Sequence, residues 1–167
     1  MTKAIYFDMD GTIANLYGVD GWLDDLINKS PRPYAEAKPL VNMSLLARLL
    51  HKAQKQGYTV NVVSWLAKNS TKEYDEKVTE VKKEWLAKHL PSVKFDEVHI
   101  IEYGTPKSTV AKGGILFDDE EQNRTEWKGF AYTEKEIFEV LKSVMSSVEK
   151  ASMKKEYSIG FLNLKDK

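Results

Sequence analysis

Five short apolar runs recur along the chain, and each ends at a polar residue or a turn. Runs of four to eight apolar residues bounded by turn signals are typical of buried strands. Amphipathic or irregular segments separate the runs, so the strands are not joined as simple hairpins. The predicted strands cover residues 4–7, 58–63, 98–101, 114–117 and 129–132.

The segments between these strands carry apolar residues at helical spacing. Leucines 45, 46, 49 and 50 with Ala53 predict an amphipathic helix over about 42–56, which ends at Gly57. Ser70-Thr71-Lys72-Glu73 is typical of a capping box and predicts a helix that runs to about His89. Thr133 is expected to cap a last helix. The apolar face of that helix is formed by Ile137, Phe138, Leu141, Val144, Met145 and Val148.

Strands that alternate with helices in this order predict an α/β fold with a mostly parallel, five-stranded sheet. We expect a Rossmann-like, three-layer arrangement. Residues 12–39 have an irregular pattern: Asp20 is expected to cap a short helix with Trp22, Leu23, Leu26 and Ile27 on one face. Prolines 31, 33 and 39 are then expected to keep the chain extended. The tail over 151–167 is compatible with an edge strand or a loose end.

Length and composition place limits on this picture. A chain of 167 residues suits one domain, which we expect to span 1–167. The absence of cysteine excludes disulfides and thiolate metal sites. The 25 basic and 25 acidic side chains cancel, so the chain as a whole lacks the basic character typical of proteins that bind long nucleic acids. No apolar run reaches membrane-spanning length and no signal peptide is evident, so we expect a cytoplasmic protein that does not contact a membrane.

The first strand ends in two carboxylates, Asp8 and Asp10, which are followed by Gly11. Residues i and i+2 of a strand share a face, so the two carboxylates begin on the same side of the chain. Carboxylates held this close repel each other unless a cation lies between them, and oxygen ligands suit Mg²⁺. The alternative interpretation is a strand followed by an ordinary Asx turn.

Polar side chains also follow two other predicted strands. Ser64 ends the second strand, and Asp118-Asp119 follow the fourth. Binding sites in parallel sheets lie at the carboxyl ends of the strands, so Asp8, Ser64 and Asp119 are expected to meet at one edge. A lysine precedes the fourth strand, and both Lys107 and Lys112 are candidates for the same edge.

The order Asp-x-Asp-Gly-Thr, strand-end Ser, Lys and strand-end Asp-Asp resembles the haloacid dehalogenase (HAD) superfamily of phosphotransferases, over residues 4–132. The resemblance implies a magnesium-dependent phosphomonoester hydrolase. It also implies that 12–39 is a flap and a small cap segment, because the insert is too short for a cap domain with its own core.

By this resemblance, Asp8 is the nucleophile that forms an aspartyl-phosphate, and Asp10 is the general acid and base. Asp8, the backbone carbonyl of Asp10 and Asp119 would hold the Mg²⁺. The supporting residues would be Asp118, which hydrogen-bonds the metal ligands, and Thr12, which orients Asp10. Ser64 would hold phosphoryl oxygens. Lys107, preferred to Lys112 by analogy with the nucleotidase branch, would supply a positive charge.

Two branches of the superfamily are similar to this chain. Asp118-Asp119 followed by Asn123 and Trp127 is similar to the 5′(3′)-deoxyribonucleotidases, whereas Thr71-Lys72-Glu73-Tyr74 and its long helix resemble the phosphatase half of polynucleotide kinase-phosphatase. We therefore expect a small phosphorylated substrate, a nucleotide, with the 3′-phosphorylated end of a nucleic acid as the alternative. Trp65 or Trp22 would stack on the base, although Trp65 is equally compatible with a core position.

Other interpretations give different roles to the remaining residues. The lysines at 72, 77, 82, 83 and 88 are interpreted as one solvated helix face. Trp127 is expected to pack in the core, and the three histidines show no ligand spacing. A response-regulator receiver would need an acceptor Asp after the third strand, where Ile101-Glu102-Tyr103-Gly104 has none. A non-catalytic binding module on the same fold is a further alternative, although the acidic residues needed for catalysis are all present. The sequence does not indicate an oligomeric state.

Overall fold

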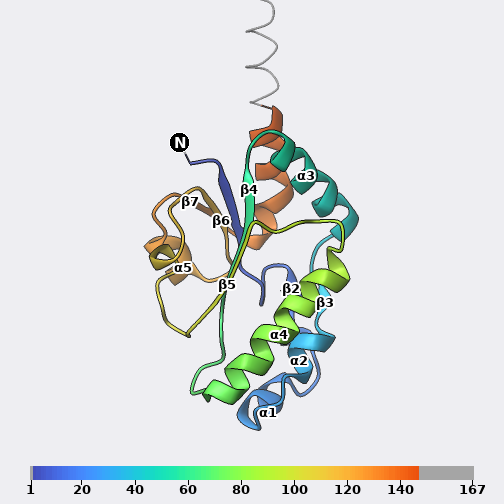
Figure 1. Ribbon diagram of the computed structural model, residues 1–167, viewed down its shortest axis with the longest axis vertical. Coiled ribbons are helices and arrows are strands. Elements are labelled where there is room, and N and C mark those ends of the chain that lie inside the picture. The colour runs from blue at the N-terminus through green and yellow to red at the C-terminus, as the bar shows by residue number, and fades with distance from the viewer. Residues whose placement is uncertain (1, 147–167) are drawn as a thin grey trace, which may run out of the picture.

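The computed structural model describes residues 2–146 and has a five-stranded sheet at its centre (Figure 1). The strand order is β5-β4-β1-β6-β7, and every pairing in this sheet is parallel. The first strand of the chain is therefore the middle strand, and the predicted α/β fold with a parallel five-stranded sheet is confirmed. The strands are β1 (Ala4–Phe7), β4 (Thr59–Trp65), β5 (Glu97–Ile101), β6 (Ile115–Phe117) and β7 (Phe130–Tyr132).

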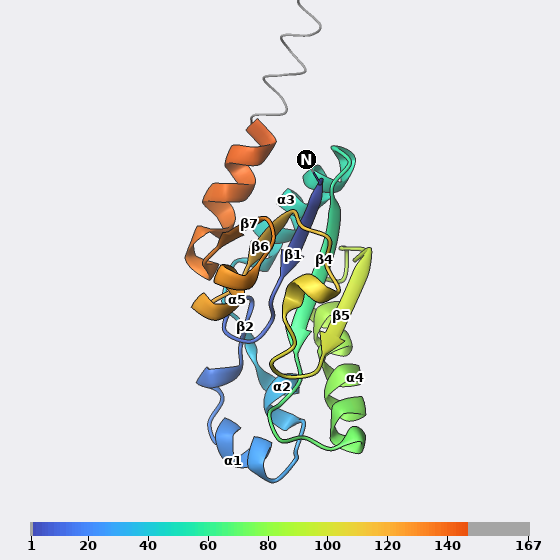
Figure 2. The same ribbon diagram turned by 90° about the vertical axis from the view of Figure 1, so that its left-hand side faces the viewer.

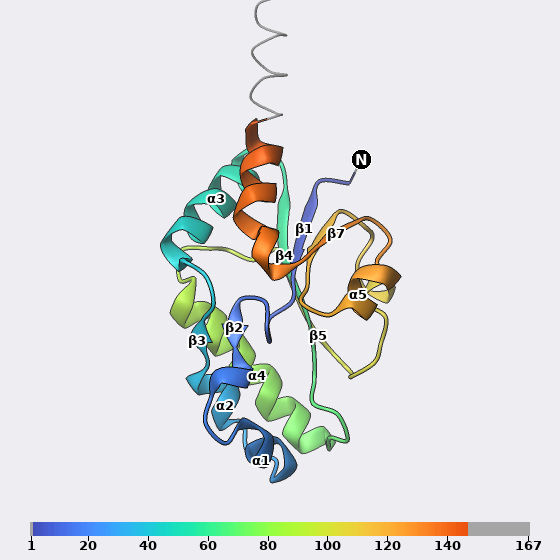
Figure 3. The ribbon, with the colours of Figure 1, turned by 180° about the vertical axis from the view of Figure 1, so that it is seen from behind.

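Alternate residues of the strands pack against different layers. Ile5 and Phe7 of β1 belong to the main apolar core, whereas Ala4 and Tyr6 belong to a second cluster on the other face. The first face is covered by α3 (Met43–Lys55), α4 (Lys72–His89) and the helix over residues 137–146 (Figure 3). The second is covered by η2 (Lys107–Thr109) and α5 (Glu121–Glu126) with their flanking turns (Figure 2). The sheet is thus the middle of three layers.

The predicted long helices are confirmed, with one change at a cap. The Asn42 side chain accepts a hydrogen bond from the Leu45 amide and caps α3. Helix α4 begins one residue later than the predicted capping box, because Thr71 and not Ser70 accepts from the Tyr74 amide. Val148 and the tail over 151–167 lie outside the described residues.

The insert over 12–39 contains more regular structure than predicted. Its two short strands pair antiparallel, and its helices lie against the N-terminal part of α4 (Figure 1). Tyr34 and Leu16 of the insert share an apolar cluster with Tyr74 and Val78 of α4. The elements are β2 (Ala14–Asn15), η1 (Leu16–Gly18), α1 (Trp22–Ile27), α2 (Arg32–Glu36) and β3 (Lys38–Pro39).

Two details of this insert differ from the prediction. Gly21, at a φ of 74°, precedes α1 as its cap, and the Asp20 carbonyl instead accepts from Arg32. The expectation that Pro31 and Pro33 keep the chain extended is wrong, because both lie at the start of α2. The first turn of a helix tolerates proline, since its amides have no partner within the helix and its φ already suits the helix.

Within residues 2–146, no helix combines the length and the apolar character needed to cross a membrane.

Candidate active site

The carboxylate of Asp8 lies at the end of β1 and is held by a buried lysine. Lys107 Nζ donates to Asp8 Oδ1 at 2.8 Å and to Asp118 Oδ2 at 2.5 Å, and its side chain is 1% exposed. Burial opposes the charge on Lys107, but Asp8 and Asp118 outweigh it and raise the pKa of the lysine. Lys112, the other candidate, is exposed. Lys107 is therefore the lysine that reaches the carboxylates.

Thr12 contacts Asp8 and Asp119, and this corrects the prediction that it orients Asp10. Its Oγ1 lies 3.0 Å from Asp8 Oδ2 and 3.1 Å from Asp119 Oδ1, and it accepts from the Asp119 amide at 3.2 Å. The reason is the tight turn after β1, in which the Thr12 amide donates to the Met9 carbonyl. This turn directs the threonine side chain back toward the end of the strand.

Asp8, Asp118 and Asp119 form a carboxylate cluster in which one oxygen from each lies within 4.8 Å of the others. Burial, followed by the nearby charge of Asp8, raises the pKa of Asp119 to about 8. Gly11 makes this approach possible: its φ is 83°, and a Cβ there would collide with the Asp119 carboxylate.

The cluster fits a hard divalent cation, because it brings three carboxylates together and Lys107 donates to two of them. Both oxygens of Asp118 already have partners, Lys107 and the Glu120 amide, so Asp118 suits a supporting position. Asp119 and Asp8 are the side chains better placed to bind a metal. The predicted metal contact from the Asp10 backbone carbonyl stays a prediction.

The carboxylate of Asp10 pairs with Lys82, which corrects the prediction that Lys82 belongs to a solvated helix face. Lys82 Nζ donates to Asp10 Oδ2 at 2.8 Å, and its side chain is 1% exposed. Burial raises the pKa of Asp10, Lys82 opposes this shift, and the charge of Asp8 adds to it.

Sequence reasoning missed Lys82, although the pattern contained a usable signal. The buried stripe of α4 includes Tyr74, Val78, Trp85 and Leu86, and Lys82 lies four residues after Val78 on the same stripe. A lysine on an apolar stripe is buried with its helix face, so it needs an acidic or polar partner inside the protein.

Ser64 lies at the sheet edge where it was predicted, but it does not border the cavity that Asp8 and Asp10 line. It is fully buried, and its Oγ accepts from Lys82 Nζ at 2.8 Å. A direct contact from Ser64 to a phosphoryl group stays a prediction.

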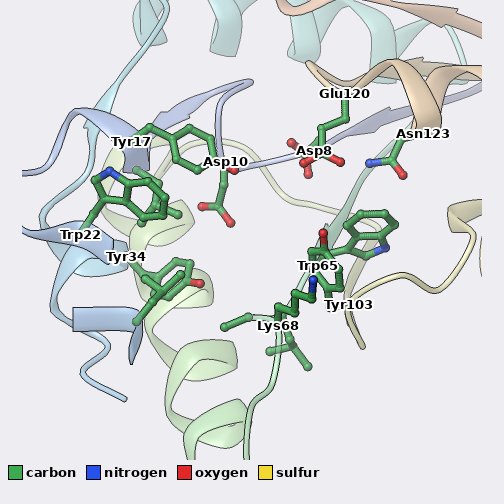
Figure 4. A pocket seen from close by; sticks show the side chains of 14 residues that line it. Asp8, Asp10, Tyr17, Trp22, Tyr34, Trp65, Lys68, Tyr103, Glu120 and Asn123 are labelled. Carbon is green, nitrogen blue, oxygen red and sulfur yellow. The ribbon is translucent and has the colours of Figure 1, made fainter. Parts of the chain in front are cut away.

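Asp8 and Asp10 line a cavity of about 270 Å³ whose walls are rich in aromatic rings (Figure 4). The flap contributes one wall, and the segments after β4 and β5 contribute the facing wall. Glu120 and Asn123 border the same cavity near Asp8 (Figure 4). The five aromatic residues are Tyr17, Trp22 and Tyr34 on the flap side and Trp65 and Tyr103 on the other.

Trp65 combines the two predicted positions, since it is 9% exposed and also lines the cavity. Its indole N–H donates to the Thr105 carbonyl at 2.8 Å, and its ring centroid lies 5.0 Å from that of Tyr103. Trp127 is packed in the core as expected, where it contacts Tyr6. Asn123 is buried, and within residues 2–146 its side-chain oxygen has no hydrogen-bond partner.

Comparisons with known proteins add little to this geometry. No protein-family model matches the chain, and no curated protein sequence matches it. Among solved structures, it is similar to D,D-heptose 1,7-bisphosphate phosphatase from Burkholderia thailandensis, with a TM-score of 0.46 and 12% sequence identity. The alignment covers 74% of this chain and 70% of that one. A likeness this distant assigns neither a family nor an activity, so the function has to be inferred from the site.

Proposed function

We propose that the protein is a magnesium-dependent phosphomonoester hydrolase with Asp8 as its nucleophile and a nucleoside monophosphate as its substrate. The observation that supports this proposal best is the setting of Asp8. Its two oxygens are held by Lys107 and Thr12, it borders the aromatic cavity, and it lies within the carboxylate cluster.

The reaction has two displacements at phosphorus. An oxygen of Asp8 attacks the phosphorus and forms an aspartyl-phosphate, the bond to the ester oxygen breaks, and Asp10 gives its proton to the departing alcohol. Water then attacks the aspartyl-phosphate, Asp10 accepts the proton of the water, and phosphate leaves. Burial raises the pKa of Asp10, and this direction favours a role as proton donor.

Asp8, Asp119 and the backbone carbonyl of Asp10 would hold Mg²⁺. When bound, the ion neutralises charge on the phosphoryl oxygens, as in other phosphoryl transfers. Asp118 would fix Lys107 and the backbone at Glu120, through the contacts that it already makes.

The aromatic cavity supports a nucleotide as substrate. Its volume is close to the lower end of small-molecule sites, which is roughly 300 Å³. A base that enters it would meet the rings of Trp22 and Trp65, and stacking on such rings contributes about 1–3 kcal/mol per base. A sugar phosphate has no base to stack on these rings, so we expect it to bind more weakly.

The charge of the chain disfavours the end of a polynucleotide as the preferred substrate. The net charge is zero, and the hollow next to the cavity is bordered by Asp75 and Glu102 as well as Lys68. Binding of a polynucleotide draws much of its affinity from contacts between basic side chains and phosphates.

The reaction is tested by Asp8→Asn with 4-nitrophenyl phosphate. We expect a folded variant without measurable turnover, and wild-type activity that EDTA abolishes and Mg²⁺ restores. Near-wild-type turnover by Asp8→Asn would show that the nucleophile is wrong. A wild-type protein that binds nucleotides without hydrolysing any phosphomonoester would be a binding module.

The substrate is tested with a panel of deoxynucleoside 5′- and 3′-monophosphates, sugar phosphates and a 3′-phosphorylated oligonucleotide. We expect the highest kcat/KM for a nucleoside monophosphate. A preference of ten-fold or more for the oligonucleotide, falling steeply with salt, would reverse the assignment. Equal values across the panel would leave only a general phosphomonoesterase.

A further inference from the structure

We infer that Lys82 is a positioning residue that fixes the carboxylate of Asp10, and that Ser64 acts by anchoring Lys82. The inference rests on the proposed function, in which Asp10 protonates the departing alcohol. It gives a role in the reaction to a buried helix lysine that does not itself border the cavity.

The ammonium group of Lys82 has three hydrogen-bond acceptors, which match its three protons. They are Asp10 Oδ2 at 2.8 Å, Ser64 Oγ at 2.8 Å and the Trp65 carbonyl at 2.7 Å. Two of the three acceptors belong to the end of β4, one of the best-buried strands. The lysine therefore links a rigid strand end to the carboxylate in the turn after β1.

The surroundings of Lys82 suit its positive charge. Its Nζ lies 5.0 Å from the ring centroid of Tyr34, which is a favourable cation–π distance. Its side chain is 1% exposed, whereas that of Asp10 is 15% exposed. Water can thus reach Asp10 but scarcely reaches the lysine. The position of the ammonium group is therefore fixed by its contacts inside the protein, and the ammonium group in turn orients the carboxylate of Asp10.

This ion pair decides which oxygen of Asp10 faces the substrate. Lys82 occupies Oδ2, which leaves Oδ1 for transfer of the proton to the departing oxygen. Lys82 also offsets the repulsion between Asp10 and Asp8, the two carboxylates that follow β1 in close succession. Without the ammonium group, Asp10 would lose its fixed orientation while Asp8 would keep its own contacts with Lys107 and Thr12.

The expected consequence is selective for the leaving group. Benzyl phosphate and 4-nitrophenyl phosphate are similar in size, but the first releases an alkoxide that needs a proton and the second releases a stable phenolate. Loss of general acid catalysis typically costs about 10²–10⁴-fold in rate. We expect Lys82→Met to lower kcat for benzyl phosphate about 100-fold, and kcat for 4-nitrophenyl phosphate less than five-fold.

Lys83→Met is the matched control, because Lys83 is the next residue of the same helix and is exposed. It should leave both rates unchanged. Ser64→Ala removes one acceptor of the ammonium group and keeps its charge. It should therefore also lower kcat for benzyl phosphate more than kcat for 4-nitrophenyl phosphate, but by a smaller factor than Lys82→Met does. Circular dichroism and thermal melting show whether each variant is folded.

The outcomes separate the inference from the proposed function. If the wild-type protein hydrolyses neither ester, the proposed function is wrong and the role of Lys82 falls with it. If the wild-type protein hydrolyses both and a folded Lys82→Met lowers both rates equally, only the inference is overturned. If Lys82→Met does not fold, Ser64→Ala decides: an equal loss on both esters would mean that Ser64 contacts the phosphoryl group instead.

Discussion

Two buried lysines reach neighbouring carboxylates from opposite faces of the sheet. Lys107 comes from η2 on one face and holds Asp8, and Lys82 comes from α4 on the other face and holds Asp10. Breaking a buried ion pair at one partner is strongly destabilising, by about 3–5 kcal/mol, because the other charge is left unpaired. Lys107 is thus bound to Asp8 and Asp118, and Lys82 to Asp10, for structural reasons as well as chemical ones.

The role of Lys107 can be separated from that of its neighbour in sequence. Removal of one donor that stabilises transition-state charge costs about 10²–10³-fold in rate. We expect a loss of this size in kcat for Lys107→Ala at saturating Mg²⁺, and little change for Lys112→Ala, whose side chain is exposed. A larger loss for Lys112→Ala would contradict the assignment.

The two acids after β6 are expected to differ in their effect on the metal. In the part of the chain that the structure describes, Asp119 bonds to Thr12 but to no lysine, whereas both oxygens of Asp118 have partners. Asp119→Ala should therefore raise the Mg²⁺ concentration for half-maximal activity more than Asp118→Ala does. Magnesium titrations of both variants measure this, and the reverse order would exchange the two roles.

At the level of elements, the insert over 12–39 is a small structure that depends on α4 for its burial. Tyr34 and Leu16 are buried against Tyr74 and Val78, whereas no residue of α1 is buried. Leu23 and Ile27 of α1 are 53% and 67% exposed, although their spacing predicted an apolar face. The insert thus places aromatic rings at the cavity without a core of its own.

The contribution of α1 to substrate binding is testable with two adjacent residues. Trp22 lines the cavity, whereas Leu23 does not border it and is exposed. We expect Trp22→Ala to raise KM for a nucleoside 5′-monophosphate about ten-fold, from the loss of base stacking. KM for ribose 5-phosphate should not change, and Leu23→Ala should alter neither. An equal rise for both substrates would exclude a base contact.

The elements that the sequence predicts well are those with a strong local pattern. Apolar runs located all five strands, and the ends of these strands predicted that Asp8, Ser64 and Asp119 lie at one edge of the sheet. Lys82 was missed because a lysine on a helix is usually solvated, and its acceptors lie 17 to 72 residues away in sequence. The predicted contact between Thr12 and Asp10 was wrong because the turn after β1 directs the Thr12 side chain toward Asp8 and Asp119. The local pattern places Lys82 on the buried stripe of α4 but does not identify its acceptors, and it gives no information on the contacts of Thr12.

At the scale of the whole molecule, the strand order concentrates acidic groups at one edge. The central strand β1 lies between β4 and β6, so the residues that follow all three strands converge. Burial raises the pKa values of Asp10, Asp118 and Asp119 together. The folded protein without a metal therefore holds more protons than the unfolded chain between about pH 4, the ordinary carboxyl pKa, and pH 8.

This difference gives stability a definite dependence on pH. Because the folded state binds more protons in this window, the free energy of unfolding falls as the pH rises from about 4 to 8. In EDTA we expect Tm to fall on the order of 5 °C between pH 5.5 and pH 8. Saturating Mg²⁺ should remove most of the fall, because the cation replaces the protons.

Thermal melts across this pH range with EDTA or Mg²⁺ measure the effect. Asp119→Asn is the control, since it removes the group whose pKa is raised to about 8, and its melts in EDTA should depend less on pH. An identical dependence of Tm on pH in EDTA and in Mg²⁺ would show that the carboxylates do not bind the metal.

The absence of buried residues in α1 has a consequence for the rates at which parts of the chain open. A six-residue helix without a buried side chain unfolds locally at little cost, whereas β1 is hydrogen-bonded on both sides in the centre of the sheet. Amide hydrogens of α1 should therefore exchange with deuterium within seconds, while those of β1 exchange only when the whole sheet opens. Local unfolding of α1 would then open the side of the cavity that Trp22 lines and let ligands enter and leave, while the residues after β1 keep their arrangement.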